Sequence, residues 1–276
     1  MKQACYFNGR ITTINKINIS PYDIGMLRGY GVFDVMAAFN SKPFLLKEHF
    51  KRLQNSAREL KLKVPFSQNE YEKILDKLIK LNGFKEATIR TIITGGISAD
   101  AFSIGKLTAY ILVEKFHDYP REIYQKGAKL ISLEHERFCP HAKITNYVEA
   151  IRNQELKKKN KALEILFVKN GKVLEASTSN IFIVKNGKII TTKEKILLGI
   201  TRNLVIKLAK KEFELEEREL SYHEVIKADE VFLTATNKHI VPIVKIDQHK
   251  IGNGKPGVVT SEVNKLYEEF RKKVCA

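Results

Sequence analysis

Four short polar segments of the chain carry the side chains most able to react or to bind an anion. The first, residues 139–147, contains Lys143, whose amine is a nucleophile when it is not protonated. The second, residues 175–182, begins with a glutamate and continues with serines, a threonine and an asparagine. The third and fourth, residues 197–202 and 234–237, add hydroxyl and amide donors. One lysine in a lysine-rich chain is usually a surface charge, so Lys143 gains meaning only from the other segments.

The third segment has the pattern of a phosphate-binding site. It precedes a predicted helix at residues 202–211, and Thr201 is placed to cap that helix. The first turn of a helix presents free backbone N–H groups, and a threonine adds a hydroxyl. Residues 197–202 are therefore expected to bind a phosphate group.

Hydrophobic spacing predicts the elements that position these segments. In the first part of the chain, strands are predicted at residues 3–7, 10–14, 31–39, 88–94 and 107–113. Helices are predicted at residues 49–62 and 68–81. Gly95-Gly96 is predicted to be a loop.

The second part of the chain begins after a predicted domain link. Residues 116–127 are polar and aromatic and contain a proline, so they are expected to join a small domain, residues 1–115, to a larger one, residues 128–276. The predicted strands of the larger domain are residues 129–134, 163–168, 180–184, 188–191 and 230–233, and its predicted helices are residues 147–160, 202–211 and 261–273. This mixture predicts a mixed α/β (α+β) fold of two domains, with a ligand site in the cleft between them.

Composition restricts the class of protein. The 276 residues, 43% hydrophobic and 29% charged, are typical of a globular protein. No run of about 18 apolar residues predicts a membrane helix, and residues 1–10 become polar too early for a signal peptide. Cys5, Cys139 and Cys275 have neither metal-ligand nor disulfide spacing, which favours the cytoplasm and predicts no metal site.

The net charge of +17 is also found in nucleic-acid-binding proteins. Here the lysines are spread along the chain, with short runs only at residues 157–159, 210–211 and 272–273. This distribution favours a solvated, lysine-rich surface over a nucleic-acid site. A basic nucleic-acid-binding protein remains as an alternative from a different functional class.

Two ordered motifs connect the polar segments. One consists of Glu175, Ser177, Asn180, Ile181, Phe182, Thr191 or Thr192, Gly199, Ile200, Thr201 and Arg202. The other is Glu48-His49-Phe50-Lys51-Arg52-Leu53, and Lys143 with Asn146 lies between the two. In this order, over nearly the full length, the chain resembles the class IV (fold-type IV) aminotransferases. That family includes branched-chain aminotransferase, D-amino acid aminotransferase and aminodeoxychorismate lyase.

The resemblance implies an enzyme that uses pyridoxal 5'-phosphate (PLP), with Lys143 holding the cofactor as a Schiff base. When the substrate amine displaces it, the freed lysine moves a proton between substrate and cofactor. Glu175 is implied to lie beside the pyridine nitrogen, because a carboxylate there keeps the nitrogen protonated and the ring an electron sink.

The resemblance also implies which groups bind the cofactor phosphate. They are Arg52, the backbone at Ile200 and Thr201, and Thr236. Arginine suits this role because its planar group can bind two phosphate oxygens. Tyr147 either donates to the phenolic oxygen of the cofactor or only packs. Members of the family complete their active site with a loop from a second subunit, which implies a homodimer.

The substrate is less clearly implied. The best-known D-amino acid aminotransferases bind the substrate carboxylate with a tyrosine and an Arg-x-His loop. Here Phe33 stands at the tyrosine position, and residues 98–102 lack the arginine and the histidine. Branched-chain enzymes favour Val-Phe-Glu-Gly in the strand that corresponds to residues 31–39. Their carboxylate-binding turn has small residues where this chain has Asn237 and Lys238. The lyase matches less well than either.

Two arginines are candidates to replace the missing carboxylate site. Arg28 precedes the strand predicted at residues 31–39. Arg90 lies inside the apolar strand predicted at residues 88–94, where a charge must pair or face a cavity. The alternatives are a surface ion pair for Arg28 and a solvent-facing side chain for Arg90. Lys238 either assists or is a surface lysine. This layout resembles a non-standard subgroup of D-amino acid transaminases, in which two arginines bind the carboxylates of D-glutamate and 2-oxoglutarate.

The sequence thus predicts a PLP-dependent transaminase that exchanges amino groups between a D-amino acid, of the D-glutamate or D-alanine type, and a 2-oxo acid by a ping-pong mechanism. Its expected partners are these small molecules and a second copy of the chain, not nucleic acid or a membrane. The nearest alternative is a branched-chain L-amino acid aminotransferase. The further alternative is a basic nucleic-acid-binding protein with a degenerate cofactor fold.

Overall fold

The computed structural model of the protein describes residues 3–276, which form two compact units. Unit 1 contains the chain up to His117, Ala142–Tyr147 and Val274–Ala276, and unit 2 contains Asp118–His141 and Val148–Lys273. The division after His117 lies within residues 116–127, where a domain link is predicted. Ala142–Tyr147 groups with unit 1, although the sequence places it in the second domain. Residues 1 and 2 of the predicted first domain lie outside the described part.

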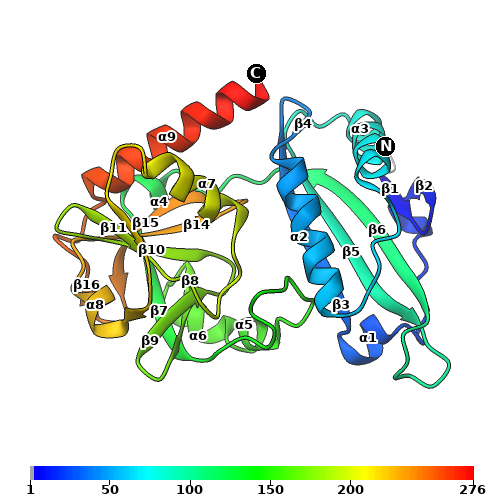
Figure 1. Ribbon diagram of the computed structural model, residues 1–276, viewed down its shortest axis with the longest axis horizontal. Coiled ribbons are helices and arrows are strands. Elements are labelled where there is room, and N and C mark those ends of the chain that lie inside the picture. The colour runs from blue at the N-terminus through cyan, green and yellow to red at the C-terminus, as the bar shows by residue number, and fades with distance from the viewer. Residues whose placement is uncertain (1–2) are drawn as a thin grey trace. The chain divides into compact units, whose positions relative to one another are not determined.

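Unit 1 is built on an antiparallel sheet with the strand order β2-β1-β6-β5-β3-β4. Its strands are β1 (Ala4–Phe7), β2 (Arg10–Thr13), β3 (Gly31–Phe39), β4 (Lys42–Pro43), β5 (Ala87–Ile97) and β6 (Lys106–Lys115). Its helices are α1 (Ile24–Arg28), α2 (Leu46–Glu59), α3 (Gln68–Asn82) and the short 3-10 helix η1 (Ile14–Lys16). Helix α2 runs along one face of the sheet, beside β3 (Figure 1).

The two faces of this sheet differ because side chains alternate along each strand. On β3, Asp34 is buried, whereas Phe33 and Val35 are half-buried. Helix α3 covers the same face as Asp34, since the Tyr71 hydroxyl lies 2.7 Å from Oγ1 of Thr91, the residue paired with Asp34. The face that carries Phe33 is therefore the less covered one.

Residues 142–147 join unit 1 because they extend its sheet beside β3. The N–H of Phe33 donates to the carbonyl of Lys143 at 2.9 Å, and the N–H of Thr145 donates to the carbonyl of Gly31 at 2.9 Å. Backbone pairing at a strand edge fixes both the position and the facing of each side chain. Lys143 is thereby held next to Phe33.

Unit 2 contains a ten-stranded sheet with the order β12-β11-β10-β14-β15-β7-β8-β9-β13, and β16 pairs with β15. Its strands are β7 (Ala128–Glu134), β8 (Glu164–Lys169), β9 (Lys172–Ala176), β10 (Asn180–Lys185), β11 (Lys188–Thr191), β12 (Leu215–Glu217), β13 (Leu220–Ser221), β14 (Glu230–Ala235), β15 (His239–Ile246) and β16 (His249–Lys250). Its helices are α4 (Glu122–Gln125), α5 (Val148–Arg152), α6 (Gln154–Lys159), α7 (Ile200–Ala209), α8 (Tyr222–Ile226) and α9 (Val258–Cys275), whose last residues group with unit 1. The predicted mixed fold class is confirmed.

Two predicted elements are wrong in detail. Strand β5 continues through the predicted Gly95-Gly96 loop to Ile97, with a register shift after Thr94. Gly96 fits there because its φ is +72° and a Cβ would lie 1.8 Å from the Lys106 carbonyl oxygen. The predicted helix at residues 147–160 is divided into α5 and α6.

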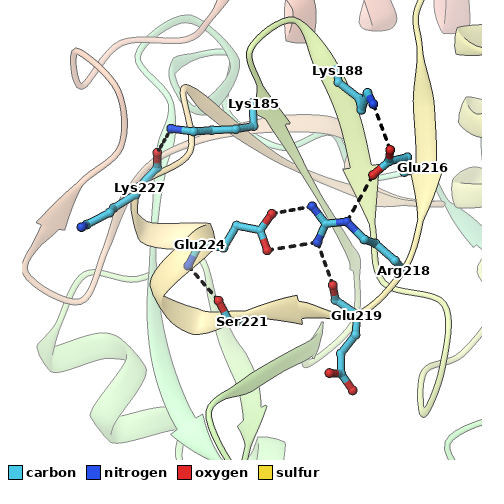
Figure 2. A network of polar contacts seen from close by, with 8 residues as sticks. All are labelled: Lys185, Lys188, Glu216, Arg218, Glu219, Ser221, Glu224 and Lys227. Atoms are coloured by element: carbon cyan, nitrogen blue, oxygen red, sulfur yellow. Dashed lines mark hydrogen bonds and ion pairs between the residues drawn. The ribbon is translucent and has the colours of Figure 1, made fainter.

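Charged side chains fasten the stretch from β12 to α8 to the edge of the unit 2 sheet (Figure 2). Arg218 donates to both carboxylate oxygens of Glu224, at 3.0 and 2.6 Å, and to Glu216 at 3.2 Å. Glu216 also accepts from Lys188 of β11 at 2.9 Å. Exposed pairs of this kind contribute about 1 kcal/mol or less each. They account for some of the lysine-rich surface without requiring a nucleic-acid partner.

Two further classes of feature are absent from residues 3–276. No helix there is long and apolar enough to cross a membrane. No three His, Cys, Asp or Glu side chains of that stretch are grouped as ligands of a metal ion.

Candidate functional site

Lys143 lies against two aromatic side chains of unit 1. Its Nζ is 4.5 Å from the centroid of the Phe33 ring and 3.5 Å from the hydroxyl of Tyr147. Its backbone N–H donates to Oγ of the buried Ser56 at 3.0 Å, so α2 also fixes this segment. Within residues 3–276 its ammonium group has no carboxylate partner. A half-buried amine without a counter-ion is placed to react with a carbonyl carbon.

Tyr147 combines the two roles left open by the sequence. Its ring meets the ring of Phe33 edge-on, with centroids 5.5 Å apart, so it packs. Its hydroxyl also points to the Lys143 amine. Its bond to the phenolic oxygen of a cofactor stays a prediction.

Arg52, predicted to bind phosphate, already has a carboxylate partner in unit 1. Its Nε lies 2.7 Å from Oδ2 of Asp34, and its Nη2 lies 3.1 Å from Oδ1. Nδ1 of His49 lies 2.6 Å from the same Oδ1. The Asp34 and His49 side chains are buried, and that of Arg52 is only 12% exposed. Two N–H groups of Nη1 and one of Nη2 are therefore left on Arg52 for a phosphate oxygen.

Burial and pairing determine the charges of this Asp34–His49–Arg52 cluster. Burial alone would raise the pKa of the Asp34 carboxyl, but Arg52 and the hydrogen bond from His49 hold it well below its usual range. Burial lowers the pKa of His49, so the ring is neutral near pH 7 and donates its Nδ1–H to Asp34. The sequence offered one signal that was not used: an acid in an apolar strand needs a partner.

In unit 2, Glu175 of β9 is 5% exposed and lies in a set of donors. Nε and Nη2 of Arg137 each lie 2.7 Å from its Oε1. The N–H of Leu197 donates to its Oε2 at 3.1 Å. The carboxylate thus carries its negative charge at a buried position. Sequence reasoning did not single out Arg137, although it lies in the same polar stretch as Lys143.

The beginning of α7 has the geometry of an anion site. The helix starts at Ile200 with Gly199 as its N-cap, so the prediction that Thr201 caps a helix starting at Arg202 is wrong. No side chain caps this end, which leaves the N–H groups of the first turn for an anion. A Cβ at position 199 would lie 2.2 Å from Oδ1 of Asn180, so a side chain there would displace the Asn180 amide.

A buried hydroxyl beside this helix end lacks a partner. Oγ1 of Thr234 forms no hydrogen bond within residues 3–276, and Thr234 is 2% exposed. Thr234 lies opposite Asn180 across β14 and β10, so their side chains share a face. Asn180 itself donates to the Leu197 carbonyl at 2.7 Å, next to the start of α7. An unpaired buried donor beside an uncapped helix fits a phosphate group.

The turn between β14 and β15 contains Thr236, Asn237 and Lys238. Thr236 and Asn237 are half-buried, whereas Lys238 is 2% exposed. Nζ of Lys238 lies 3.1 Å from Oε1 of Glu164. Lys238 is therefore not a surface lysine, and its ammonium group is already paired.

The two arginines predicted to bind substrate are half-buried or exposed in unit 1. Nε of Arg90 lies 3.5 Å from Oε2 of Glu114, with 42% and 40% of the two side chains exposed. The guanidinium of Arg28 lies 4.7 Å from the centroid of the exposed Phe102 ring and donates to the Leu27 carbonyl at 3.2 Å. Neither is held by a buried partner.

The predicted site residues thus form two clusters. Unit 1 brings together Lys143, Tyr147 and Phe33. Unit 2 brings together Glu175, Asn180 and the start of α7 with Ile200 and Thr201. The buried carboxylate, the uncapped helix and the unpaired Thr234 hydroxyl fit the ring nitrogen and the phosphate of PLP.

Comparison with known proteins gives one family. The family model for amino-transferase class IV matches residues 31–246. The chain is 32% identical to a putative branched-chain-amino-acid aminotransferase of Methanocaldococcus jannaschii, over 97% of this chain and 96% of the relative. It is 29% identical to a D-alanine aminotransferase of Bacillus licheniformis, over 93% of each. Its structure is similar to that of the branched-chain amino acid aminotransferase of Thermoproteus uzoniensis with norvaline: the TM-score is 0.88 and the identity 26%, over 98% of this chain and 94% of the other.

The Asp34–Arg52 pair gives a prediction about stability and pH. Replacing Arg52 by Met leaves the buried Asp34 carboxylate without its cation, with only the neutral His49 as a side-chain donor. This change is expected to lower the free energy of unfolding by about 3–5 kcal/mol at pH 7. The folded-state pKa of Asp34 lies below its ordinary value of 3.8, so the contribution of the pair is present above that pH and is lost as the pH falls through the folded-state pKa. In the variant, burial raises that pKa. The difference between variant and wild type should therefore shrink as the pH falls through the raised pKa of the variant carboxyl, beginning above pH 3.8.

Urea unfolding from pH 3 to pH 7 measures this difference, and Arg52→Lys, which keeps the charge, serves as the matched control. The control should lose less stability than Arg52→Met. A loss below about 1 kcal/mol, or one that does not change with pH, would contradict the pairing.

Proposed function

Because the chain belongs to the class IV aminotransferases, we propose that it transfers an amino group between a D-amino acid and a 2-oxo acid, with PLP as its cofactor. One observation carries the proposal: the Lys143 amine lies between the Phe33 ring and the Tyr147 hydroxyl without a carboxylate partner in the described chain. That is the arrangement expected of a lysine that binds an aldehyde and then works as a base.

Lys143 would act twice in this proposal. Its amine would hold the cofactor in the resting enzyme, and once free it would take the proton from the substrate Cα. The Phe33 ring packs against the amine, and Tyr147 offers a hydrogen bond that orients it. The backbone bonds to Phe33 and Ser56 keep the amine at one place throughout.

We propose that the unit 2 cluster serves the same cofactor molecule. Bound PLP supplies an electron sink, provided that its ring nitrogen stays protonated. Glu175 would hold that proton by its negative charge, and Arg137 and Leu197 fix the carboxylate in place. Ile200, Thr201 and Thr236 would bind the phosphate, with Nη1 of Arg52 as a further donor.

The position of Arg90 supports a substrate with a second carboxylate. Arg90 lies opposite Val35, so its side chain is on the same face of the sheet as Phe33, two residues further along β3. Its ion pair with Glu114 is exposed and contributes about 1 kcal/mol or less, so the guanidinium can turn to a substrate carboxylate at little cost. A dicarboxylic partner such as 2-oxoglutarate suits this cation.

Arg28 is the second proposed contact for a substrate carboxylate. It ends α1, and the following Gly29 carbonyl accepts from the Thr145 hydroxyl at 2.7 Å. This bond ties the end of α1 to the segment that carries Lys143. The ring of Phe102 holds the guanidinium by a cation–π contact, which leaves the N–H groups that do not donate to Leu27 for an anion.

A branched-chain L-amino acid aminotransferase is the second candidate. It is favoured by the Methanocaldococcus jannaschii relative and by the Thermoproteus uzoniensis structure, both of which carry a branched-chain name. The relatives named D-alanine aminotransferase are about as similar. The hand of the substrate therefore has to be decided by experiment.

A panel of half-reactions distinguishes the two candidates. PLP-loaded enzyme is mixed with D-alanine, D-glutamate, L-leucine or L-valine, and conversion of the cofactor to its amine form is followed by absorbance. The D-amino acids are expected to convert it. Conversion by L-leucine or L-valine, but by neither D-amino acid, would support the branched-chain activity instead.

Substitution of Arg90 tests its contact with the substrate. Arg90→Gln is expected to raise the KM for 2-oxoglutarate by about tenfold or more, because a charge-assisted hydrogen bond is lost. Glu114→Gln is the matched control: it breaks the same ion pair but keeps the arginine, and it should leave this KM nearly unchanged. Equal effects of both variants would show that the ion pair, not the cation, matters.

We further propose a homodimer. Around α1 and the loop after β5, Tyr22, Met26 and Phe102 are 66%, 69% and 76% exposed. Tyr22 and this loop are neighbours, since the Ser98 N–H donates to the Tyr22 carbonyl at 3.2 Å. Grouped, exposed apolar side chains mark protein interfaces. Sedimentation equilibrium should give twice the chain mass, and Met26→Glu should weaken the association; a wild-type monomer at micromolar concentration would contradict the proposal.

A further inference from the structure

Unit 2 contains a buried ion pair. Glu164, on β8, and Lys238, in the turn between β14 and β15, have side chains that are only 5% and 3% exposed. Nζ of Lys238 lies 3.1 Å from Oε1 of Glu164. These two residues are far apart in the sequence, so the pair fastens together two separate parts of the sheet.

Glu164 also holds the turn that joins β9 to β10. Its Oε2 accepts from the backbone N–H of Thr178 at 2.7 Å, from the Thr178 hydroxyl at 3.0 Å and from the Ser177 hydroxyl at 3.1 Å. The Ser179 hydroxyl donates to its Oε1. This turn separates Glu175 from Asn180, the two residues that contact Leu197. One carboxylate therefore fixes the spacing between the proposed ring contact and the start of α7.

Lys238 fixes the turn between β14 and β15, also through hydrogen bonds of its charged group. Its ammonium group donates to the Thr178 hydroxyl at 2.9 Å and to Oδ1 of Asn237 at 3.4 Å, and it lies 5.2 Å from the centroid of the Tyr119 ring. Its carbonyl accepts from the Tyr124 hydroxyl at 3.1 Å. The side chain is thus directed inward, into the unit.

The pair stays charged at neutral pH. Burial alone would lower the pKa of Lys238, but Glu164 outweighs burial and raises it. Burial alone would likewise raise the pKa of Glu164, but Lys238 and the hydroxyl and amide donors lower it. A buried ion pair has a desolvation cost that an apolar pair of similar size avoids, so stability alone does not explain it. The ions also fix the conformation of the two turns, because each hydrogen bond constrains an angle as well as a distance.

We propose that Glu164 and Lys238 are positioning residues that hold the turn with Thr236 and Asn237 at the substrate, so that Lys238 determines substrate affinity without touching the substrate. This inference rests on the proposed function. It assigns Lys238 a role different from the direct carboxylate contact that its sequence position suggests. Asn237 can then present its amide N–H groups in one fixed arrangement to both the amino acid and the oxo acid, while Thr236 serves the cofactor phosphate.

The test compares Lys238→Met and the double variant Glu164→Gln/Lys238→Met with wild type. Lys238→Met leaves a buried carboxylate unpaired; the double variant removes both charges and keeps the fold accessible if the single variant is unstable. Both are expected to raise the KM for the amino acid and for the oxo acid by about tenfold, with kcat changed by less than about threefold. Lys172→Met is the matched control, since Lys172 pairs with Glu219 at 2.7 Å on the surface of the same unit.

A second readout needs no activity. In the cofactor-free protein, backbone amides of residues 177–180 and 236–239 are expected to exchange with deuterium faster in both variants, but not in the control. Wild-type KM values and wild-type exchange in the double variant would overturn the inference while leaving the proposed function intact. Failure of the wild-type chain to bind PLP would overturn the proposed function, and with it the role of the pair toward a substrate.

Discussion

The backbone pairing of residues 142–147 with the edge of β3 is the constraint on which the candidate site depends. The chain has already entered unit 2 when it returns to unit 1 for these residues. Two hydrogen bonds, from Phe33 to Lys143 and from Thr145 to Gly31, hold it there. Side chains in a paired strand have no freedom to change face without a register shift. Lys143 is consequently fixed over the Phe33 ring before any ligand binds.

A second feature of the structure is that two of its buried carboxylates are paired with cations from other parts of the chain. Asp34 with Arg52 connects β3 to α2, and Glu164 with Lys238 connects β8 to the turn after β14. Lys143 differs, because it is half-buried and has no carboxylate partner in the described chain. Where other buried ions are satisfied, an unsatisfied amine is a mark of chemistry rather than of stability.

An element or a site residue can be predicted from the sequence where the pattern that marks it is a short, continuous run of residues. Strand β3 was predicted at both ends, because an apolar run lies between Tyr30-Gly31 and the Asn40-Ser41 turn. Strand β15 was not predicted, because Pro242 interrupts its pattern although it pairs with Phe232. The motifs located Lys143, Glu175 and the start of α7, since each is a short run of residues.

Contacts between distant parts of the chain were not predictable from one sequence. Lys238 was expected to be a substrate contact or a surface lysine, and nothing near it in the sequence indicates that Glu164 would bury it. Asp34 and Arg137 were missed as partners of Arg52 and Glu175 for the same reason. A register shift after Thr94 likewise depends on the facing strand, so Gly95-Gly96 reads as a loop in the sequence alone.

We propose that Lys143, and no other lysine, holds the cofactor. Borohydride reduction of the PLP-loaded protein, followed by proteolysis and mass spectrometry, identifies the lysine that carries the pyridoxyl group. We expect the added mass on the peptide that contains Lys143. In Lys143→Ala, we expect neither this mass nor the visible absorbance band. Stoichiometric labelling of a different lysine, or a Lys143→Ala protein that keeps the band, would contradict it.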